Sequence, residues 1–262
     1  MSTHLRSRKG PEPRRLIDLN ADLGERPGSL AEDYEILRSV TSVNIACGFH
    51  AGDPATMAAL CERSAELEVA VGAHVSYRDR EGFGRRELEV PPKVLAAEVA
   101  QQLSSLQQHA SRAGTSVRYI KPHGALYNRA ARDLSVAEAV ATGVITSGAS
   151  LPLLCPPTSM LALAATERGL EAVCEGFADR AYCADGSLAP RSTESALLDR
   201  DAALLQGLAL ATGSPVATDS GRWLLLPVRS LCIHSDSPGA AQLAAALRAA
   251  LERAGLTVQA FT

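Results

Sequence analysis

The chain has 262 residues, 46% of them hydrophobic, and a formal net charge of -3 at pH 7. This mild charge gives no electrostatic reason to expect a nucleic acid or an anionic membrane as a partner. No run reaches the roughly 18 to 20 apolar residues that span a bilayer, and the amino terminus lacks a signal-peptide pattern. We therefore expect a cytoplasmic protein with a small-molecule substrate. Residues 1–15, basic and rich in proline, should form a flexible tail before one catalytic domain at 16–262.

The first strand-like segment of the domain alternates apolar and polar side chains, beginning with Ile17 and Leu19 as its apolar members. Polar groups lie on this segment and just after it, namely Asp18, Asn20, Asp22 and Glu25. Carboxylates at the end of a strand can orient a water, accept its proton or bind a cation. The alternative is ordinary turn chemistry, because aspartate and asparagine also favour the starts of loops.

The next apolar run ends in a polar stretch, Asn44-Ile45-Ala46-Cys47-Gly48-Phe49-His50-Ala51-Gly52-Asp53. Asp53 is a predicted helix N-cap, and Pro54 then occupies the first helical position. Glycines on either side of Phe49 and His50 let the backbone turn tightly and approach a bound molecule. This pattern is typical of the strand ends of α/β enzymes.

Two later segments place a histidine in the same position. Val69 to His74 and Val117 to Gly124 each carry an apolar run that ends at a histidine, His74 and His123 respectively. A single histidine could be a satisfied core residue, but three such placements favour a functional site at the carboxyl ends of parallel strands. Lysine is scarce in this chain, so Lys121, beside His123, is a further candidate for polarising a carbonyl or binding a phosphate. A solvated lysine is the alternative.

The remaining pattern alternates strands and helices. A long loop between His74 and Pro92 contains Gly-Phe-Gly followed by Arg85 and Arg86, which suits a lid over an anionic substrate. Polar groups again follow a strand at Glu175, Asp179 and Arg180.

About seven strands, near residues 16, 43, 69, 117, 151, 170 and 230, predict a distorted or incomplete (β/α) barrel rather than a doubly wound sheet. We expect helices at 54–68, 93–112, 160–167 and 193–212, one opened by a capping box at Ser135–Glu138, and a last one capped by Ser237 and Pro238.

These groups suit the hydrolysis of a small polar substrate, in which Asp22 takes a proton from water and histidine or lysine stabilises the oxyanion. The expected catalytic residues are Asp22, His50, His74, Lys121 and His123. The expected substrate-binding residues are Asp18, Asn20, Glu25, Asn44, Gly48, Asp53, Glu175, Asp179 and Arg180.

A divalent metal bound by histidine and aspartate is a second possible way to activate the water. The chain has no H-E-x-x-H or H-x-x-x-H pair, so such a site would combine residues from separate strands. Cys47 and His50 could form half of a zinc site, although no second short-spaced pair completes it. Spacing does not choose between the two mechanisms. The P-loop, G-x-G-x-x-G and G-x-S-x-G motifs are absent from the sequence.

Five motifs, in this order, resemble the LamB/YcsF family. They are Asp18 to Glu25, Asn44 to Asp53, Gly72-Ala73-His74, Lys121-Pro122-His123-Gly124-Ala125-Leu126-Tyr127-Asn128 and Glu175 to Tyr182. The resemblance implies a barrel related to glycoside hydrolases and deacetylases. It also implies an activity, shared with partner subunits B and C, that opens 5-oxo-L-proline to L-glutamate while ATP is hydrolysed. Val75, Arg78 and Ser235 depart from the family pattern, which affects loop shape more than reaction class.

Two other functions stay open from the sequence. One is a metal-dependent, deacetylase-like amidohydrolase that acts alone. The other is a non-catalytic binding or scaffold protein for small acids.

Overall fold

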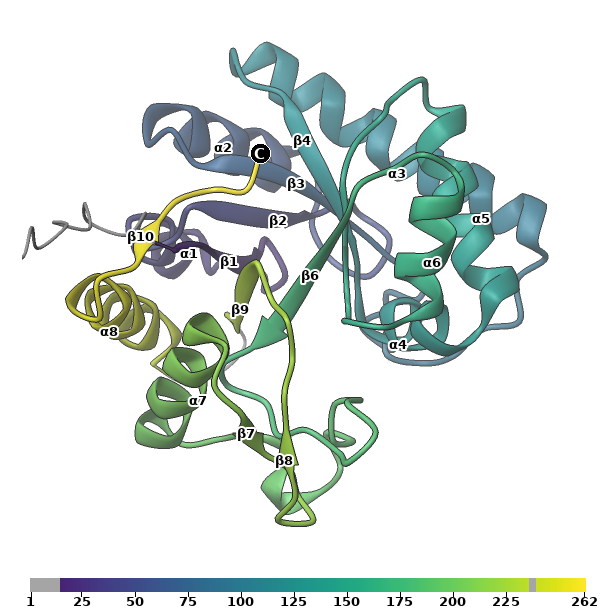
Figure 1. The fold of residues 1–262 in the computed structure, drawn as a ribbon. Helices are drawn as coiled ribbons and strands as arrows, with labels where there is room; N and C mark the ends of the chain where they lie inside the picture. Colours follow the sequence, from purple (N-terminus) through teal and green to yellow (C-terminus); the bar gives the residue numbers. More distant parts are fainter. Residues whose placement is uncertain (1–14, 236–238) are drawn as a thin grey trace, which may run out of the picture.

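The structure is a computed structural model that describes residues 15–235 and 239–262. Seven parallel strands form a closed barrel (Figure 1). The barrel closes because the last strand pairs with both the sixth and the first. The predicted seven-unit barrel is therefore confirmed. In order around the barrel, the strands are β1 (Leu16–Leu23), β2 (Ser42–Ala46), β3 (Ala70–Val75), β4 (Val117–Pro122), β5 (Leu153–Cys155), β6 (Ala172–Phe177) and β9 (Ser230–His234).

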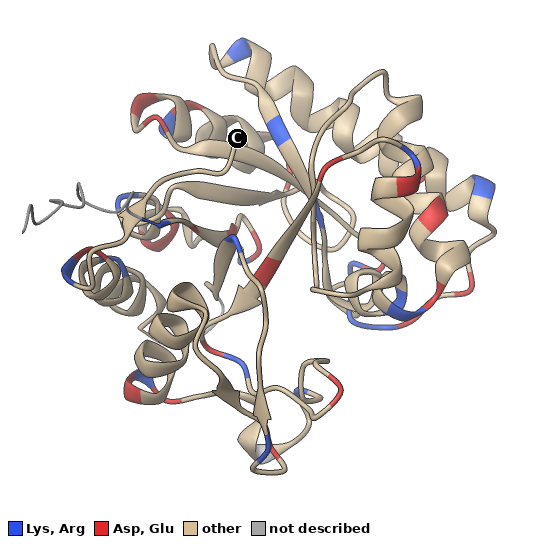
Figure 2. Cartoon of the chain, viewed as in Figure 1, with Lys and Arg blue, Asp and Glu red and all other residues tan. Residues whose placement is uncertain are grey.

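Helices follow the strands and pack around the outside of the barrel (Figure 1). They are α1 (Leu30–Leu37), α2 (Pro54–Glu66), α3 (Pro92–Arg112), α4 (Gly124–Arg132), α5 (Leu134–Thr146), α6 (Met160–Glu167), α7 (Arg200–Thr212) and α8 (Ala240–Arg253). A short hairpin of β7 (Val216–Ala217) and β8 (Trp223–Leu224) lies to one side, and β10 (Thr257–Val258) pairs with the start of β1. Figure 2 shows that acidic and basic residues are intermixed over the outer helices. None of these helices is long and apolar enough to cross a membrane.

The alternation in β1 sorts its side chains into two environments. Ile17 and Leu19 join the large hydrophobic cluster that also contains Ile36 and Leu37 of α1. The polar members of β1 are buried in the barrel interior, where they form a chain of hydrogen bonds. Asn44 Nδ2 donates to Asp22 and Asn20 oxygens, each at 2.7 Å, Asn20 donates to Ser230 at 2.7 Å, and Ser230 donates to Asp18. The interior is thus polar along β1 and β2, whereas Tyr119, Leu154 and Val173 of β4, β5 and β6 form a small buried apolar cluster.

Asp18 at the lower end of this chain makes the stability of the fold pH-dependent. Burial raises its pKa to about 6, although hydroxyl donors from Ser230, Ser42 and Thr41 oppose the shift. In the unfolded chain the pKa of an aspartate is about 3.9. Between these values the folded chain holds a proton that the unfolded chain has released, so stability falls as pH rises.

We therefore expect wild type to lose up to about 3 kcal/mol of unfolding free energy relative to Asp18→Asn between about pH 4 and pH 6. Urea denaturation of both proteins at several pH values measures this difference, in which other titrating groups cancel. A difference that stays constant from pH 4 to pH 8 would contradict the prediction.

Several predicted boundaries were wrong for local reasons. Helix α5 begins at Leu134, because the Asp133 carboxylate caps it by accepting from the backbone of Ser135 and Val136; the predicted capping box does not open it. Helix α7 starts only at Arg200, after the Asp199 N-cap, instead of at 193. The predicted cap of α2 by Asp53 is confirmed. The predicted tail up to residue 14, and the predicted cap at 237–238, lie outside the described residues.

Candidate functional site

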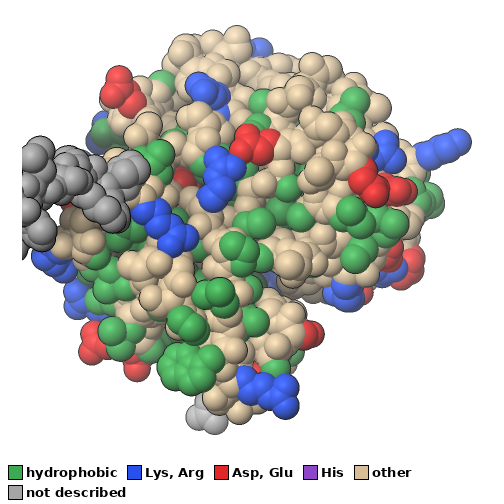
Figure 3. Space-filling view, in the orientation of Figure 1, with side chains coloured by type: hydrophobic (Ala, Val, Ile, Leu, Met, Phe, Trp, Pro, Cys, Tyr) green, Lys and Arg blue, Asp and Glu red, His purple; other side chains and the backbone are tan. Residues whose placement is uncertain are grey.

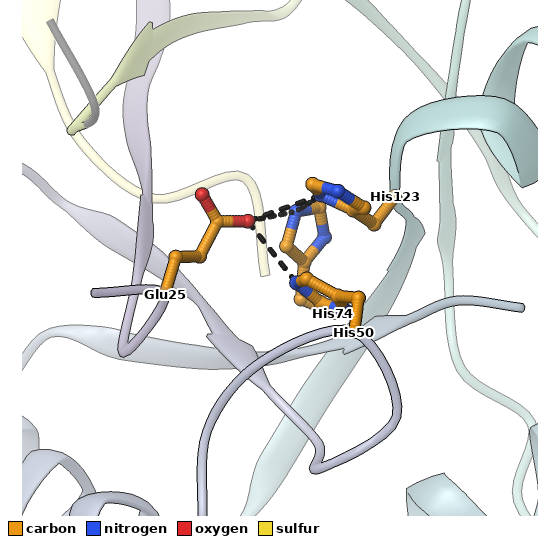
Figure 4. Close-up of side chains that lie close together, drawn as sticks. All are labelled: Glu25, His50, His74 and His123. Carbon is orange, nitrogen blue, oxygen red and sulfur yellow. Dashed lines mark hydrogen bonds and ion pairs between the residues drawn. The ribbon is translucent and has the colours of Figure 1, made fainter. Parts of the chain in front are cut away.

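Three histidines and one glutamate meet at the carboxyl ends of the first four strands (Figure 4). Glu25 follows β1, His50 follows β2, His74 lies in β3 and His123 follows β4. All four side chains are buried. Glu25 Oε1 lies 3.0 Å from His123 Nδ1, 3.2 Å from His50 Nε2 and 3.4 Å from His74 Nε2. The four residues therefore form a cluster that could hold a metal ion, which we call the Glu–His cluster.

The other ring nitrogen of each histidine points away from Glu25 and meets a hydrogen-bond acceptor. His74 Nδ1 lies 3.1 Å from the Lys121 carbonyl oxygen, and His123 Nε2 lies 2.9 Å from the Phe83 carbonyl oxygen. His50 Nδ1 lies 2.9 Å from Ser76 Oγ, whose own proton goes to the Tyr77 carbonyl. These contacts fix the orientation of all three rings.

A buried ion network lies below this cluster, on the floor of the barrel mouth. The Lys121 ammonium lies 2.9 Å from Asp22 Oδ1 and 3.2 Å from Glu175 Oε2, and it donates to Cys232 Sγ at 2.9 Å. Lys121 is only 2% exposed, so its charge is held among groups that the protein itself supplies. His74 Nε2, at 3.4 Å from Asp22 Oδ2, connects this network to the Glu–His cluster.

The pKa values of these groups follow from burial and from their neighbours. Burial by itself would raise the pKa of Asp22, but His74 and Lys121 outweigh it and hold that pKa well below its usual range. Burial by itself would lower the pKa of Lys121, yet Asp22, Cys232 and Glu175 raise it well above the usual value. The floor is therefore a carboxylate paired with an ammonium over the whole neutral range.

Burial and neighbouring charges shift the pKa values of two histidines in the Glu–His cluster in opposite directions. Burial, together with the neighbouring His123, lowers the pKa of His50 to about 3. For His74, the carboxylates of Asp22 and Glu25 outweigh burial and raise the pKa to about 9.

A cavity of about 210 Å³ opens above the floor. Asp22, Glu25, His74, Lys121 and His123 form its base. Its walls carry cationic and aromatic groups from several loops and strand ends: Arg85, Tyr127, Phe177, Arg180, Arg191 and His234. His234 is held in place by Asp179, whose carboxylate lies 3.0 Å from Nδ1. The volume and the positive walls suit a small anionic molecule.

The loop between β3 and α3, predicted to act as a lid, covers one side of the mouth. It supplies the Phe83 carbonyl to His123 and the Arg85 side chain to the cavity wall. Gly84 has a φ of +65°, and a Cβ there would lie 2.8 Å from both His50 and His123. Only glycine therefore fits at this point. Arg86 instead pairs with Asp79, and movement of the loop stays a prediction.

The structure brings most of the predicted site residues together. The cavity or the groups directly beneath it include Asp22, Glu25, His50, His74, Lys121, His123, Glu175, Asp179 and Arg180. Asn20 and Asn44 lie deeper, in the interior hydrogen-bond chain, with Asp18 at its far end.

Two predicted residues lie elsewhere. The Gly48 carbonyl accepts from Arg80, and Asp53 is exposed and caps α2. Cys47 donates to the Ile45 carbonyl and lies outside the Glu–His cluster, so the C-x-x-H pair does not act as a unit.

Sequence reasoning missed residues that hold the site in place and residues that line its cavity. Gln102 of α3 clamps Ser76, accepting from its backbone N–H at 2.9 Å and donating to its carbonyl at 3.0 Å. Cys232 on β9 contacts Lys121, and Tyr127 and Phe177 line the cavity wall. Cys232 and Phe177 lie on strands. The sequence could have indicated them only as a cysteine and an aromatic residue near the end of a predicted strand.

The sequence profile of the LamB/YcsF family matches residues 17–262. The chain is 51% identical over 249 residues to a Streptomyces coelicolor protein named as the A subunit of 5-oxoprolinase, covering 94% of this chain and 100% of that protein. A Kocuria rhizophila protein of the same name is 45% identical, with 94% and 99% covered. The crystal structure of a lactam utilization protein from Thermus thermophilus is 39% identical, covers 94% of this chain and 99% of that one, and has a TM-score of 0.86.

More distant structures share the fold alone. The catalytic domain of a peptidoglycan N-acetylglucosamine deacetylase from Eubacterium rectale is 12% identical, covers 97% of this chain and 91% of that domain, and has a TM-score of 0.51.

Proposed function

Because the chain belongs to the LamB/YcsF family, we propose that it works as the A subunit of an ATP-dependent 5-oxoprolinase, which opens 5-oxo-L-proline to L-glutamate. The observation that carries this proposal is the 51% identity, over the whole length of the relative, to a protein that bears the name of that subunit. The cavity supports it independently. A five-membered lactam with one carboxylate is small and anionic. It therefore matches the volume of the cavity and the arginine side chains on the cavity walls.

In the proposed reaction, Asp22 acts as the base. Asn44 and Lys121 both donate to Asp22 Oδ1. Oδ2, whose neighbour is His74 Nε2 at 3.4 Å, is the oxygen that would take a proton from water. The water oxygen bonds to the lactam carbonyl carbon, the ring C–N bond breaks, and Asp22 returns the proton to the departing nitrogen. The Lys121 ammonium stabilises the negative charge that develops on the carbonyl oxygen.

The remaining groups position the substrate. Arg180, Arg191 and Arg85 lie on the cavity wall and would attract the substrate carboxylate. His74, His123 and Glu25 form the base beside Asp22 and would orient the reacting water. His50 stacks on His123, with ring centroids 3.8 Å apart, and so fixes that ring.

We also propose ATP as the co-substrate. A five-membered lactam is a stable amide, and ATP can drive its opening only if the two reactions share an intermediate. In the coupled reaction the γ-phosphoryl group of ATP passes to the lactam oxygen and ADP leaves. Water then adds to the activated carbon, the ring C–N bond breaks to give an acyl phosphate, and a second water releases phosphate and L-glutamate. The sequence has no P-loop, so a different kind of nucleotide site, or one shared with a partner, is required. The use of ATP supports a cytoplasmic location.

The test is a reconstituted assay that follows glutamate and phosphate from 5-oxo-L-proline and ATP. This chain combined with partner subunits B and C is expected to release both products, and omission of any one of the three is expected to abolish glutamate formation. A complete mixture of folded subunits that forms no glutamate would refute the function.

The proposed partners need a surface, and the region around the β7–β8 hairpin offers one. Trp223 is 74% exposed and Leu225 is 63% exposed. Figure 3 shows hydrophobic side chains gathered on the lower part of this face, where Figure 1 places β7 and β8. A groove of about 580 Å³ beside Leu225 shares Tyr127 and Phe177 with the cavity, so a partner docked there would reach the lactam.

Trp223→Ser is therefore expected to weaken binding of the B and C subunits by about 30-fold or more, since interface tryptophans commonly contribute about 2 kcal/mol or more. Surface plasmon resonance measures this affinity. The matched control is Ile145→Ser at the end of α5, an apolar residue of 42% exposure, which should leave binding unchanged. Equal effects of the two substitutions would exclude the hairpin as the docking surface.

A second candidate is a metal-dependent, deacetylase-like amidohydrolase that acts alone. The Glu–His cluster favours it, because three histidines and a carboxylate are typical ligands of a catalytic metal. This candidate predicts amide hydrolysis by the isolated chain without ATP, and loss of that activity on chelation. Activity that needs ATP and both partners would exclude it.

A further inference from the structure

We infer that Glu25, His50, His74 and His123 bind one divalent transition-metal ion, through Glu25 Oε1, Nε2 of His50 and His74, and Nδ1 of His123. The four ligand atoms lie within 4.8 Å of one another. The inference concerns what the chain binds, and it holds whichever of the two functions above is correct.

The separations between the ligand atoms fit a shared ion. Two ligand atoms each about 2.1 Å from a tetrahedral zinc ion lie about 3.4 Å apart. In the cluster, Glu25 Oε1 lies 3.0 to 3.4 Å from the three ring nitrogens, and His123 Nδ1 lies 3.0 Å from His74 Nε2. Small shifts of the side chains would therefore place all four atoms around one ion.

The hydrogen bonds on the far side of each ring decide where the protons are. A backbone carbonyl can only accept, so His74 Nδ1 and His123 Nε2 must carry hydrogens. Ser76 gives its proton to the Tyr77 carbonyl, so it accepts from His50 Nδ1. The inner nitrogen of each ring is then the one that faces Glu25 Oε1. A divalent ion bound there would displace any proton that an inner nitrogen holds, because histidine ligates a metal through a deprotonated nitrogen.

This pattern is also the one that metal sites use. Metal-binding histidines commonly donate their second ring N–H to a carbonyl or carboxylate, which fixes the tautomer and the ring orientation. Here all three histidines donate to an oxygen in this way, and Gln102 in turn clamps Ser76, the acceptor for His50.

The ligand set indicates the class of metal. Three imidazole nitrogens and one carboxylate oxygen suit Zn²⁺ and its neighbours Co²⁺ and Ni²⁺, whereas Mg²⁺ and Ca²⁺ prefer oxygen ligands. The ion would act as a Lewis acid at the edge of the cavity, beside Asp22. His74 and His123 line that cavity, so a bound ion would lie beside the space that the substrate occupies.

The test uses the full chain, stripped of metal with a chelator and titrated with Zn²⁺ by calorimetry, and with Co²⁺ by visible absorption. One ion per chain and the absorption bands of tetrahedral Co²⁺ are expected. His123→Ala should abolish both signals. Ser76→Ala, which removes only the acceptor for His50, should weaken binding by about 10- to 100-fold.

The matched control is His109→Ala on α3, a histidine outside the cluster, which should bind as wild type does. Circular dichroism checks that each variant is folded. Binding of less than one ion in ten chains, or equal affinity in wild type and folded His123→Ala, would overturn the inference. Neither result depends on 5-oxoprolinase activity, so failure of the metal site is distinguishable from failure of the proposed function.

Discussion

Replacing Asp22 with asparagine is expected to lower the rate of glutamate formation by about 10²- to 10⁴-fold, the usual contribution of a positioned acid–base group. The substitution keeps the shape of the side chain and an oxygen for the donors Asn44 and Lys121, but it removes the group that takes the proton from water. Initial rates in the reconstituted assay, at saturating 5-oxo-L-proline and ATP, measure the loss. The KM for 5-oxo-L-proline should change much less than kcat.

Asp53→Asn is the matched control for this experiment. Asp53 was also predicted to bind substrate, but the structure places it as the exposed N-cap of α2. Because asparagine caps helices as well as aspartate does, the control should retain the wild-type rate. Equal losses in both variants, or a wild-type rate in Asp22→Asn, would show that the base has been misassigned.

Replacing Lys121 with methionine is expected to have the largest effect on stability, a loss of about 3 to 5 kcal/mol. The substitution leaves Asp22 and Glu175 buried as two carboxylates without their shared cation. Urea denaturation at pH 7.5 measures the loss. Lys93→Met, at an exposed position at the start of α3, should stay within about 0.5 kcal/mol of wild type.

A second substitution separates the charge effect from simple loss of packing. Adding Glu175→Gln to Lys121→Met removes one of the two buried carboxylates that lack a cation, so the double variant should be more stable than Lys121→Met alone. A double variant that is no more stable would mean that the unpaired carboxylates of Asp22 and Glu175 do not cause the loss of stability in Lys121→Met.

The alternation of polar and apolar residues made the barrel and its mouth predictable from the sequence. In β1 the period of two assigns Asp18, Asn20 and Asp22 to one face, and the structure buries that face inside the barrel. The strand-end positions of His74 and His123 likewise predicted that residues far apart in the chain would meet, because parallel strands end at one edge.

The contacts that orient the site could not be predicted. Gln102 and Ser76 are 26 residues apart, and nothing in a helical pattern says which glutamine turns inward to hold a loop. The stretch between Arg180 and Asp199 also lacks periodicity. Residues there bend back to pair with the strand-end segment, with Leu198 N–H donating to the Asp179 carbonyl. For this reason α7 begins at Arg200 and not at residue 193, where the sequence pattern predicted its start.

The central claim is that the lactam is opened in the cavity above Asp22 and Lys121. The most direct measurement is a crystal structure of the Asp22→Asn chain, in complex with its partners, grown with 5-oxo-L-proline. The account predicts density for the lactam in that cavity, with its carbonyl toward Lys121 and its carboxylate toward the arginine-bearing wall. Density for the lactam on one of the partners, with this cavity holding only water, would contradict it.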